Sequence, residues 1–286
     1  MKVLAFGEVL WDVYPDGAYI GGAPFNFAAH MAKHNNEVWM CTSIGTDALG
    51  RSTMEAFNKQ NIHTECVSVL SEKQTGKCLV TLDQKGIPSY QLLTDVAYDY
   101  ISVPENAAGT YDVLYFGTLA LRSQHNMQTL TKLVACDSFR DIFVDINLRP
   151  PYYSKETINF ALLHATILKI SEEELDTVLQ NVTIPFSEDY QIVAQSLCDL
   201  FPNLKLILIT CGEKGACAYR ALDKKFCFCQ AKAVNVASTV GAGDSFSAAF
   251  LSHILQGKDI QESLEHAVKI SAYVVSCKDA VPEYEV

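Results

Sequence analysis

The chain has 286 residues, of which 49% are hydrophobic and 19% charged, so it can bury a large core and is too apolar to be disordered. Its formal net charge is −11, from 33 acidic and 22 basic residues, and it has no basic stripe of the kind that binds nucleic acid. No apolar run approaches the roughly 20 residues that span a bilayer. We therefore expect a cytoplasmic protein without nucleic-acid or membrane partners.

Val3–Phe6 is the first of six short, nearly continuous apolar runs, a pattern typical of strands buried on both faces. It resembles the core of a signal peptide, but Gly7, Glu8 and Asp12 interrupt it, which favours a strand. The other runs are 38–41, 113–116, 142–146, 167–170 and 206–209, with amphipathic helical stretches at 25–34, 49–60, 125–139 and 189–201. The alternation predicts an α/β fold, with a mostly parallel central sheet flanked by helices, in a single domain over 1–286.

Residues 64–94 depart from this alternation. Strand-like segments at 64–69, 77–82 and 89–93 mix polar and apolar residues, and the turn-rich segment 83–86 predicts a hairpin between the last two. We expect a small β-sheet lid, formed by about residues 12–22 and 64–94, over the carboxyl ends of the strands where such folds bind ligands. Its exposed face would also suit a homodimer formed through the lid.

The ten cysteines are scattered along the chain, and only Cys227 and Cys229 lie close together. Without a paired CxxC motif, a structural zinc site is not expected. Most of the cysteines fall in apolar segments, where a free thiol packs as a small hydrophobic group. We therefore predict reduced structural thiols.

The segment TVGAGDSF, residues 239–246, directly precedes an amphipathic helix and carries the clearest chemical signal. Gly241 and Gly243 allow a tight turn, and the helix start adds N–H groups without intrahelical acceptors and a partial positive charge. With Ala242 between them, they predict an anion hole for a phosphoryl group. Asp244 in the first turn is either the base that deprotonates an attacking hydroxyl or an acid favoured there by the helix dipole. This stretch alone does not decide between the two.

Two common nucleotide-binding motifs are excluded. A dinucleotide fingerprint would need a third glycine at position 246, which is Phe246, and a first strand before the motif. No GxxxxGKS or GxxxxGKT segment occurs anywhere, so a P-loop is excluded as well. Phosphate must therefore be held in another way.

Polar residues after the first strand are candidates for ligand contacts. Gly21 and Gly22 permit close approach of the backbone to a ligand, and the Asn26 amide offers a donor and an acceptor to a polyol. The alternative is a helix N-terminal turn with Asn26 solvated. Asp12 is either a carboxylate that accepts two sugar hydroxyls or a turn residue after the strand, and Glu8 is a weaker candidate.

Asp145, Asn147 and Arg149 alternate at the end of an apolar run. The two-residue period of a strand predicts that all three side chains point the same way, as a polar cluster at its carboxyl end. Arg149 would then contact the sugar or a phosphoryl oxygen. The alternative is that Asp145 or Asn147 caps the loop after the strand.

Several motifs together resemble the ribokinase-like (PfkB) carbohydrate kinases, in the order of that family and over essentially the whole chain. They are GGAPFNFA at 21–28, GTDALG at 45–50, FGTLA at 116–120, DINLRP at 145–150, KISEEE at 169–174, LITCGEKG at 208–215 and GAGDSF at 241–246. DINLRP and FGTLA are similar to the fructokinase branch. The resemblance implies a ribokinase-like fold and transfer of the γ-phosphoryl group of ATP to a sugar, with fructose giving fructose 6-phosphate as the leading reaction.

The resemblance also implies roles for residues at the matching positions. Asp244 is the catalytic base, and the backbone of Gly241, Ala242 and Gly243 holds the phosphoryl group. Asp12, Gly21, Gly22, Asn26 and Arg149 bind the sugar, and Lys169, Thr210, Gly212 and Gly215 bind ATP. Glu174 steadies Mg²⁺ and its waters, although a glutamate in a run of three also suits a solvated helix start.

Three positions depart from the family pattern. Ser171 stands where Asn is common in the metal network, Ser238 replaces the Asp before the motif threonine, and Asp279 stands where a glycine is usual. In many members that missing Asp helps to hold a monovalent cation. We therefore predict weak dependence on potassium, unless Asp279 restores the charge from the other side.

Two rival functions follow from the same motifs. One is a kinase for a different substrate, such as 2-keto-3-deoxygluconate, ribose or a nucleoside. The other is a catalytically silent family member with a binding or regulatory role. Retention of Asp244 and both glycines argues against the silent protein.

Overall fold

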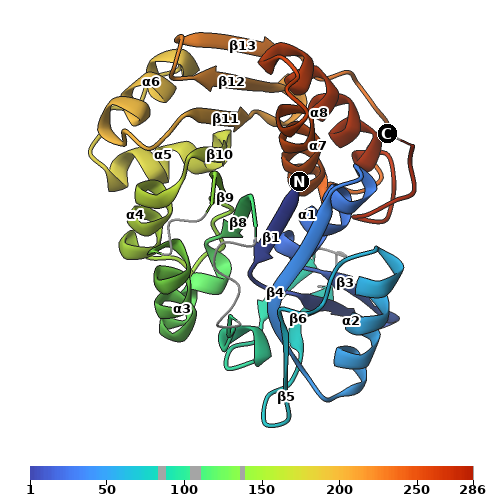
Figure 1. Ribbon diagram of the computed structural model, residues 1–286. Helices are drawn as coiled ribbons and strands as arrows, with labels where there is room; N and C mark the ends of the chain where they lie inside the picture. The colour runs from blue at the N-terminus through green and yellow to red at the C-terminus, as the bar shows by residue number, and fades with distance from the viewer. Residues whose placement is uncertain (83–87, 104–110, 136–138, 286) are drawn as a thin grey trace.

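The molecule is built around a central sheet with the strand order β13-β12-β11-β10-β9-β8-β1-β4-β5 (Figure 1). The computed structural model describes residues 1–82, 88–103, 111–135 and 139–285. The strands are β1 (Lys2–Phe6), β4 (Glu37–Gly45), β5 (Val67–Leu70), β8 (Val113–Gly117), β9 (Asp141–Asp145), β10 (Ile167–Ser171), β11 (Leu206–Thr210), β12 (Ala216–Arg220) and β13 (Lys225–Cys229). In this order, neighbouring strands are parallel from β5 at one edge as far as β11. Strands β12 and β13 then form an antiparallel edge. All six apolar runs form strands of this sheet, which confirms the predicted α/β architecture.

Helices cover both faces of the central sheet (Figure 1). One face carries α1 (Ala23–Lys33), α2 (Ala48–Lys59), α7 (Ala242–Leu255) and α8 (Ile260–Val275), and the other carries α3 (Gln124–Ala135), α4 (Lys155–His164), α5 (Glu172–Asn181) and α6 (Tyr190–Leu200). Side chains of β1 alternate between the two cores, since Val3 and Ala5 join the cluster under α1, α7 and α8. Leu4 and Phe6 join the opposite cluster. The four predicted helices are confirmed, although residues 136–138, near the end of the one expected over 125–139, lie outside the described residues.

A separate four-stranded sheet has the order β3-β2-β6-β7. Its strands are β2 (Leu10–Tyr14), β3 (Gly17–Gly21), β6 (Gly76–Leu82) and β7 (Pro88–Leu92). The antiparallel pairing of β6 with β7 confirms the expected hairpin, whose predicted turn at 83–86 falls outside the described residues. The smaller sheet that we expected beside the main one therefore exists.

Its predicted boundaries were wrong in one respect. We expected residues 64–69 in the small sheet, but β5 pairs in parallel with the end of β4, from Thr42 opposite Val67 to Gly45 opposite Leu70. Strand β4 is nine residues long and its carboxyl half leaves an edge that β5 covers. Mixed polarity is typical of edge strands in either sheet, so it did not reveal which sheet β5 joins.

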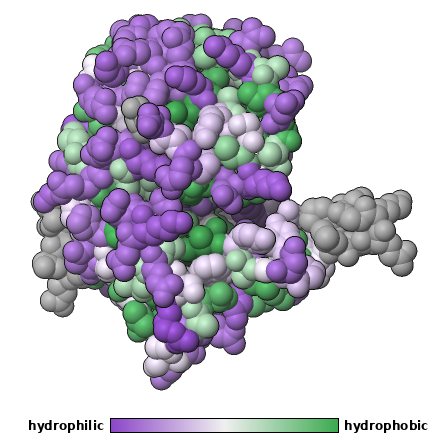
Figure 2. All heavy atoms as spheres, turned by 90° about the vertical axis from the view of Figure 1, so that its right-hand side faces the viewer, coloured by the Kyte–Doolittle hydropathy of each residue, from purple (hydrophilic) through white to green (hydrophobic). Residues whose placement is uncertain are grey.

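One face of the molecule shows how hydrophilic and hydrophobic side chains are distributed on it. On the face shown in Figure 2, hydrophilic side chains predominate, and hydrophobic ones occur in smaller areas between them. Within the described segments, no helix combines the length and the hydrophobicity that crossing a membrane requires.

Candidate active site

The glycine-rich segment before α7 forms a turn in which glycine is required. Gly241 is the N-cap of α7 and has a left-handed backbone with φ of 81°. A Cβ atom there would lie 2.5 Å from the carbonyl oxygen of Ala280, so both conformation and space select glycine. The first helical hydrogen bond runs from the N–H group of Ser245 to the carbonyl of Gly241, over 2.9 Å. The N–H groups of Gly243 and Asp244 therefore have no intrahelical acceptor, as an anion hole requires.

The Asp244 side chain is buried beside these amides, with 9% of the residue exposed. Its Oδ2 atom accepts a hydrogen bond of 2.8 Å from Asn26 Nδ2. Burial raises the pKa of Asp244, against the effects of the Asn26 hydrogen bond and of the positive charges of Lys169 and Arg149. The Asn26 amide, which we expected to bind the sugar, thus holds the candidate base. Its Oδ1 atom is buried without a partner among the described residues.

A buried ion pair lies against the glycine turn. Lys169 Nζ lies 3.0 Å from both carboxylate oxygens of Asp145, and the two side chains are 8% and 1% exposed. A Cβ atom at Gly243 would come within 2.9 Å of Lys169 Nζ, so the ammonium group reaches the anion hole. Burial lowers the pKa of Lys169, but the charges of Asp145 and Glu174 outweigh it and the pKa is raised. Lys169 is therefore a fixed positive charge where phosphate is expected.

The Glu174 carboxylate joins two segments of the site. Its Oε1 atom accepts a hydrogen bond of 2.5 Å from the N–H group of Leu148, and its Oε2 atom accepts one of 2.9 Å from the N–H group of Ser171. Ser171 is the N-cap of α5, so Glu174 ties this helix start to the loop after β9.

The residues around Glu174 can be compared with those that the expected Mg²⁺ would need. In the part of the chain that the structure describes, no group of three or more His, Cys, Asp or Glu side chains could hold a metal ion. Mg²⁺ bound with a nucleotide needs only one or two carboxylates, since phosphates and waters fill the other positions. Glu174 fits that role, because each of its oxygens keeps a lone pair for a metal-bound water.

Arg149 lies on the loop after β9, and its charge acts on Asp12 and Asp244. The regular alternation behind our expectation of three side chains on one side ends with the strand at Asp145, because Asn147 has φ of 41°. Asp145 is buried in the ion pair, whereas Arg149 is exposed. Arg149 therefore reaches the site through the turn of the loop, which strand periodicity does not describe.

The small sheet brings a second acidic group to the site. Asp12 on β2 faces β3, where a Cβ atom at Gly21 would lie 3.3 Å from Asp12 Oδ2. Burial raises the pKa of Asp12. Gly22 has φ of 106°, and a Cβ atom there would lie 2.7 Å from the carbonyl oxygen of Glu8. Contact within the chain thus already requires glycine at position 22, and the approach of its backbone to a ligand stays a prediction.

The residues that we expected to bind the nucleotide lie at and after the end of β11. Thr210 is the last residue of this strand, and Gly212 has φ of 55°. A Cβ atom at Gly212 would stand in open space, since no atom lies within 4 Å of its position. At Gly215, by contrast, a Cβ atom would lie 2.0 Å from the carbonyl oxygen of Cys229. Gly212 leaves room for a ligand, whereas Gly215 is explained by packing against β13.

Two further buried groups lie beside these residues. Glu8, only a weak candidate from the sequence, is 2% exposed, and its Oε2 atom has no partner in the described part of the molecule. The sequence signal for Glu8 was its position directly after the first strand. Cys78 was missed, although it lies opposite Asp12 in the β2–β6 ladder. That register joins distant segments of the chain and has no signature in the sequence.

The pfkB family of carbohydrate kinases matches the chain over residues 15–285. The chain belongs to this family.

Individual relatives agree with the family match. The probable fructokinase-2 of Arabidopsis thaliana is 26% identical over 301 residues, covering 96% of this chain and 88% of its own. The fructokinase of Salmonella typhimurium is 27% identical over 271 residues, covering 88% of this chain and 84% of its own. A crystal structure of fructokinase with bound ATP from Xylella fastidiosa has a TM-score of 0.86 at 20% identity, with 98% of this chain and 94% of that chain covered. The predicted ribokinase-like fold is thereby confirmed.

The positions associated with a monovalent cation are altered in this kinase. Ser238 Oγ accepts the N–H group of Val240 at 3.2 Å, so the hydroxyl serves its own loop. Asp279 is exposed, one residue before the Ala280 carbonyl that packs on Gly241. This set lacks the charge of a tight cation site, because position 238 offers a neutral hydroxyl in place of a carboxylate.

Proposed function

We propose that this carbohydrate kinase transfers the γ-phosphoryl group of ATP to a sugar hydroxyl, with Asp244 as the catalytic base. The observation that carries the proposal is the place of the Asp244 carboxylate. It is buried in the first turn of α7, held by Asn26, and adjacent to two amides without intrahelical acceptors. A carboxylate beside an anion hole is unfavourable unless it performs chemistry, and accepting the proton of an attacking hydroxyl is such a role.

In the proposed reaction, the sugar oxygen forms a bond to the γ-phosphorus while the bond from that phosphorus to the β,γ-bridging oxygen breaks. ADP leaves with the bonding electrons, and the hydroxyl proton passes to Asp244. Burial raises the pKa of Asp244, which makes it a stronger acceptor for that proton. The amides of Gly243 and Asp244, with Lys169, stabilise charge on the transferring group. Glu174 would hold a water of Mg²⁺ bound with the nucleotide, and the ion would supply further positive charge to the phosphates.

Fructose is the proposed acceptor, giving fructose 6-phosphate. The support comes from relatives named as fructokinases at 26% and 27% identity and from the carboxylate of Asp12 and the guanidinium of Arg149, whose charges interact. A carboxylate and a guanidinium are complementary to several hydroxyls of a polyol.

A coupled assay of ADP release tests both parts of the proposal. The panel contains fructose, ribose, 2-keto-3-deoxygluconate and a nucleoside, with no sugar as the blank. We expect turnover that requires both ATP and Mg²⁺ and the highest kcat/KM with fructose. A higher kcat/KM with another acceptor would show that fructose is not the preferred substrate. No turnover with any acceptor would favour a catalytically silent family member.

We also propose that the small sheet acts as the lid. Asp12, Tyr19 and Cys78 lie opposite one another across β3, β2 and β6, so one face of the sheet carries the sugar-binding carboxylate. On the same face, Tyr19 and Tyr90 are 56% and 58% exposed. Exposed aromatic rings next to a binding site suit either contact with a sugar or pairing with a second copy of the chain.

A further inference from the structure

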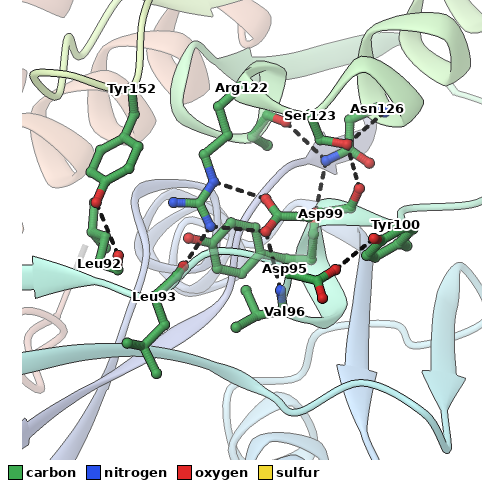
Figure 3. Close-up of polar contacts among 12 residues, drawn as sticks. Leu92, Leu93, Asp95, Val96, Asp99, Tyr100, Arg122, Ser123, Asn126 and Tyr152 are labelled. Atoms are coloured by element: carbon green, nitrogen blue, oxygen red, sulfur yellow. Dashed lines mark hydrogen bonds and ion pairs between the residues drawn. The ribbon is translucent and has the colours of Figure 1, made fainter.

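Arg122 lies at the end of η2 (Leu119–Arg122), far in sequence from the residues of the site, and its side chain is only 8% exposed. Its guanidinium makes two bonds to Asp99, from Nε to Oδ1 over 2.8 Å and from Nη2 to Oδ2 over 3.0 Å (Figure 3). It is also 4.8 Å from the ring centroid of Tyr98 and 5.0 Å from that of Tyr152. A buried ion pair by itself is weak evidence for stability, so this geometry calls for another explanation.

The same groups hold the end of the small sheet. Arg122 Nη2 donates to the carbonyl of Leu93 at 2.7 Å, and the Tyr152 hydroxyl donates to the carbonyl of Leu92 at 3.0 Å (Figure 3). Leu92 is the last residue of β7, the edge strand of the small sheet. Two consecutive carbonyls at the exit of that sheet are therefore fixed by side chains of the main body.

Tyr152 connects this contact to the active site. Its N–H group donates to the carbonyl of Arg149 at 2.6 Å, closing a turn from the arginine to the tyrosine. The charge of Arg149 acts on Asp12 and Asp244, whereas the Arg149 side chain itself is exposed. The backbone that carries Arg149 is thus tied through one tyrosine to the end of β7.

We propose that Arg122 and Tyr152 are positioning residues that fix Arg149 relative to the small sheet and thereby set sugar affinity. Arg122 acts indirectly, because its guanidinium holds the Leu93 carbonyl and stacks on the ring of Tyr152. An exposed arginine on a backbone that is already held has less conformational freedom to lose on binding, so fixing Arg149 raises the affinity for the sugar. This inference rests on the proposed sugar-kinase function.

The test replaces one hydroxyl. Tyr152→Phe keeps the ring against Arg122 and removes the bond to Leu92. Tyr153→Phe is the matched control, because the Tyr153 hydroxyl makes no hydrogen bond within the described residues and the site does not use it. One hydrogen bond corresponds to about 2- to 10-fold in an equilibrium constant. We expect Tyr152→Phe to raise the KM for the sugar by that factor and to leave the KM for ATP unchanged, with Tyr153→Phe like wild type.

A double-mutant cycle separates positioning from general stability. In an Arg149→Met background, Tyr152→Phe should cause no further loss of kcat/KM for the sugar, because the residue it positions is gone. Arg122→Lys should give the same pattern and serves as the second variant if Tyr152→Phe fails to fold. An equal loss with and without Arg149, an equal change in both KM values, or no change at all would overturn the proposal.

Amide hydrogen exchange gives a readout that needs no turnover. In Tyr152→Phe, exchange should rise together in residues 88–92 and 146–153, and in Tyr153→Phe it should not. Unchanged exchange in both segments would overturn the inference even if the enzyme is an active fructokinase. Absence of turnover in the wild type, with the exchange result as expected, would overturn the proposed function alone.

Discussion

At the scale of single residues, the site places carboxyl groups where burial sets their protonation. Glu8 is buried beside Asp244, and burial raises its pKa from the usual 4.5 to about 7, with the Asp244 charge adding to the rise. The folded chain therefore binds the Glu8 proton more tightly than the unfolded chain does. Because the pKa of Glu8 is raised, the contribution of this residue to the unfolding free energy falls as the pH rises from about 4.5 to 7.

Replacing Glu8 by Gln should remove this pH dependence. Because one pKa unit corresponds to about 1.4 kcal/mol, the unfolding free energy of Glu8→Gln relative to wild type should grow by about 2–3 kcal/mol between pH 5 and pH 8. Urea unfolding at a series of pH values measures the difference, in which the contributions of all other groups cancel. A difference that stays constant over this range would show that Glu8 is ionised in the folded chain.

Ser238 stands where related kinases have a carboxylate, so we expect turnover to depend little on the monovalent cation. Ser238 is neutral, so a monovalent ion beside the anion hole would lack a charged ligand at this position. We expect nearly equal turnover in potassium, sodium or tetramethylammonium at matched ionic strength. A strong requirement for potassium would instead mean that Asp279 supplies the missing charge.

At the scale of elements, helices α7 and α8 and the C-cap residue of α1 meet through histidines. The rings of His253 and His266 stack at 3.8 Å between centroids, and His34 meets His266 edge-on at 5.3 Å. Both ring nitrogens of His34 are buried without a partner within the described segments. Burial, followed by the neighbouring histidines, lowers the pKa of His34 to about 3, so the interface holds neutral imidazoles.

Protonation of His34 in the unfolded chain should therefore lower stability in mild acid, with a sign opposite to that of the Glu8 contribution. A histidine with a depressed pKa is protonated in the unfolded chain first, so stability falls as the pH drops below about 6.5. At pH 5 His34 alone accounts for a loss of up to about 2 kcal/mol. His34→Phe keeps a ring and should reduce the loss between pH 7 and pH 5 by that amount, measured by chemical unfolding. An undiminished loss would mean that His34 is not buried in its neutral form.

The elements of this fold differ in how well the sequence predicts them. Strands such as β1 and β11 are buried on both faces, so their apolar runs are unmistakable. Strand β5 was assigned to the wrong sheet because an edge strand carries no mark of its partner. In the site, glycine at position 241 and aspartate at 244 were evident from local chemistry, whereas the Asn26–Asp244 bond joins α1 to α7 and depends on tertiary packing.

At the scale of the whole molecule, the proposed lid offers a surface for a second copy. Tyr19 on β3 and Tyr90 on β7 are exposed on the two edge strands of the small sheet. If the sheet pairs with its counterpart, a charged group there is buried on association and disfavours it. We expect the wild type to sediment as a dimer at micromolar concentration and Tyr90→Glu to sediment as a monomer. A monomeric wild type would contradict the dimer, and unchanged protease sensitivity with sugar bound would contradict the lid.

The whole molecule brings three segments together at one point: the turn before α7, the carboxyl ends of β9 and β10, and the small sheet. The central claim is that Asp244 accepts the proton of the attacking hydroxyl there. Asp244→Asn keeps the size of the side chain but removes its basicity, and loss of a positioned base lowers turnover by about 10²–10⁴-fold.

The most direct measurement is kcat of Asp244→Asn beside wild type, with far-UV circular dichroism and ATP affinity measured on the same samples. We predict that kcat falls by about two to four orders of magnitude while fold and ATP binding persist. Turnover like that of the wild type in the folded variant would contradict the role of Asp244 as the base.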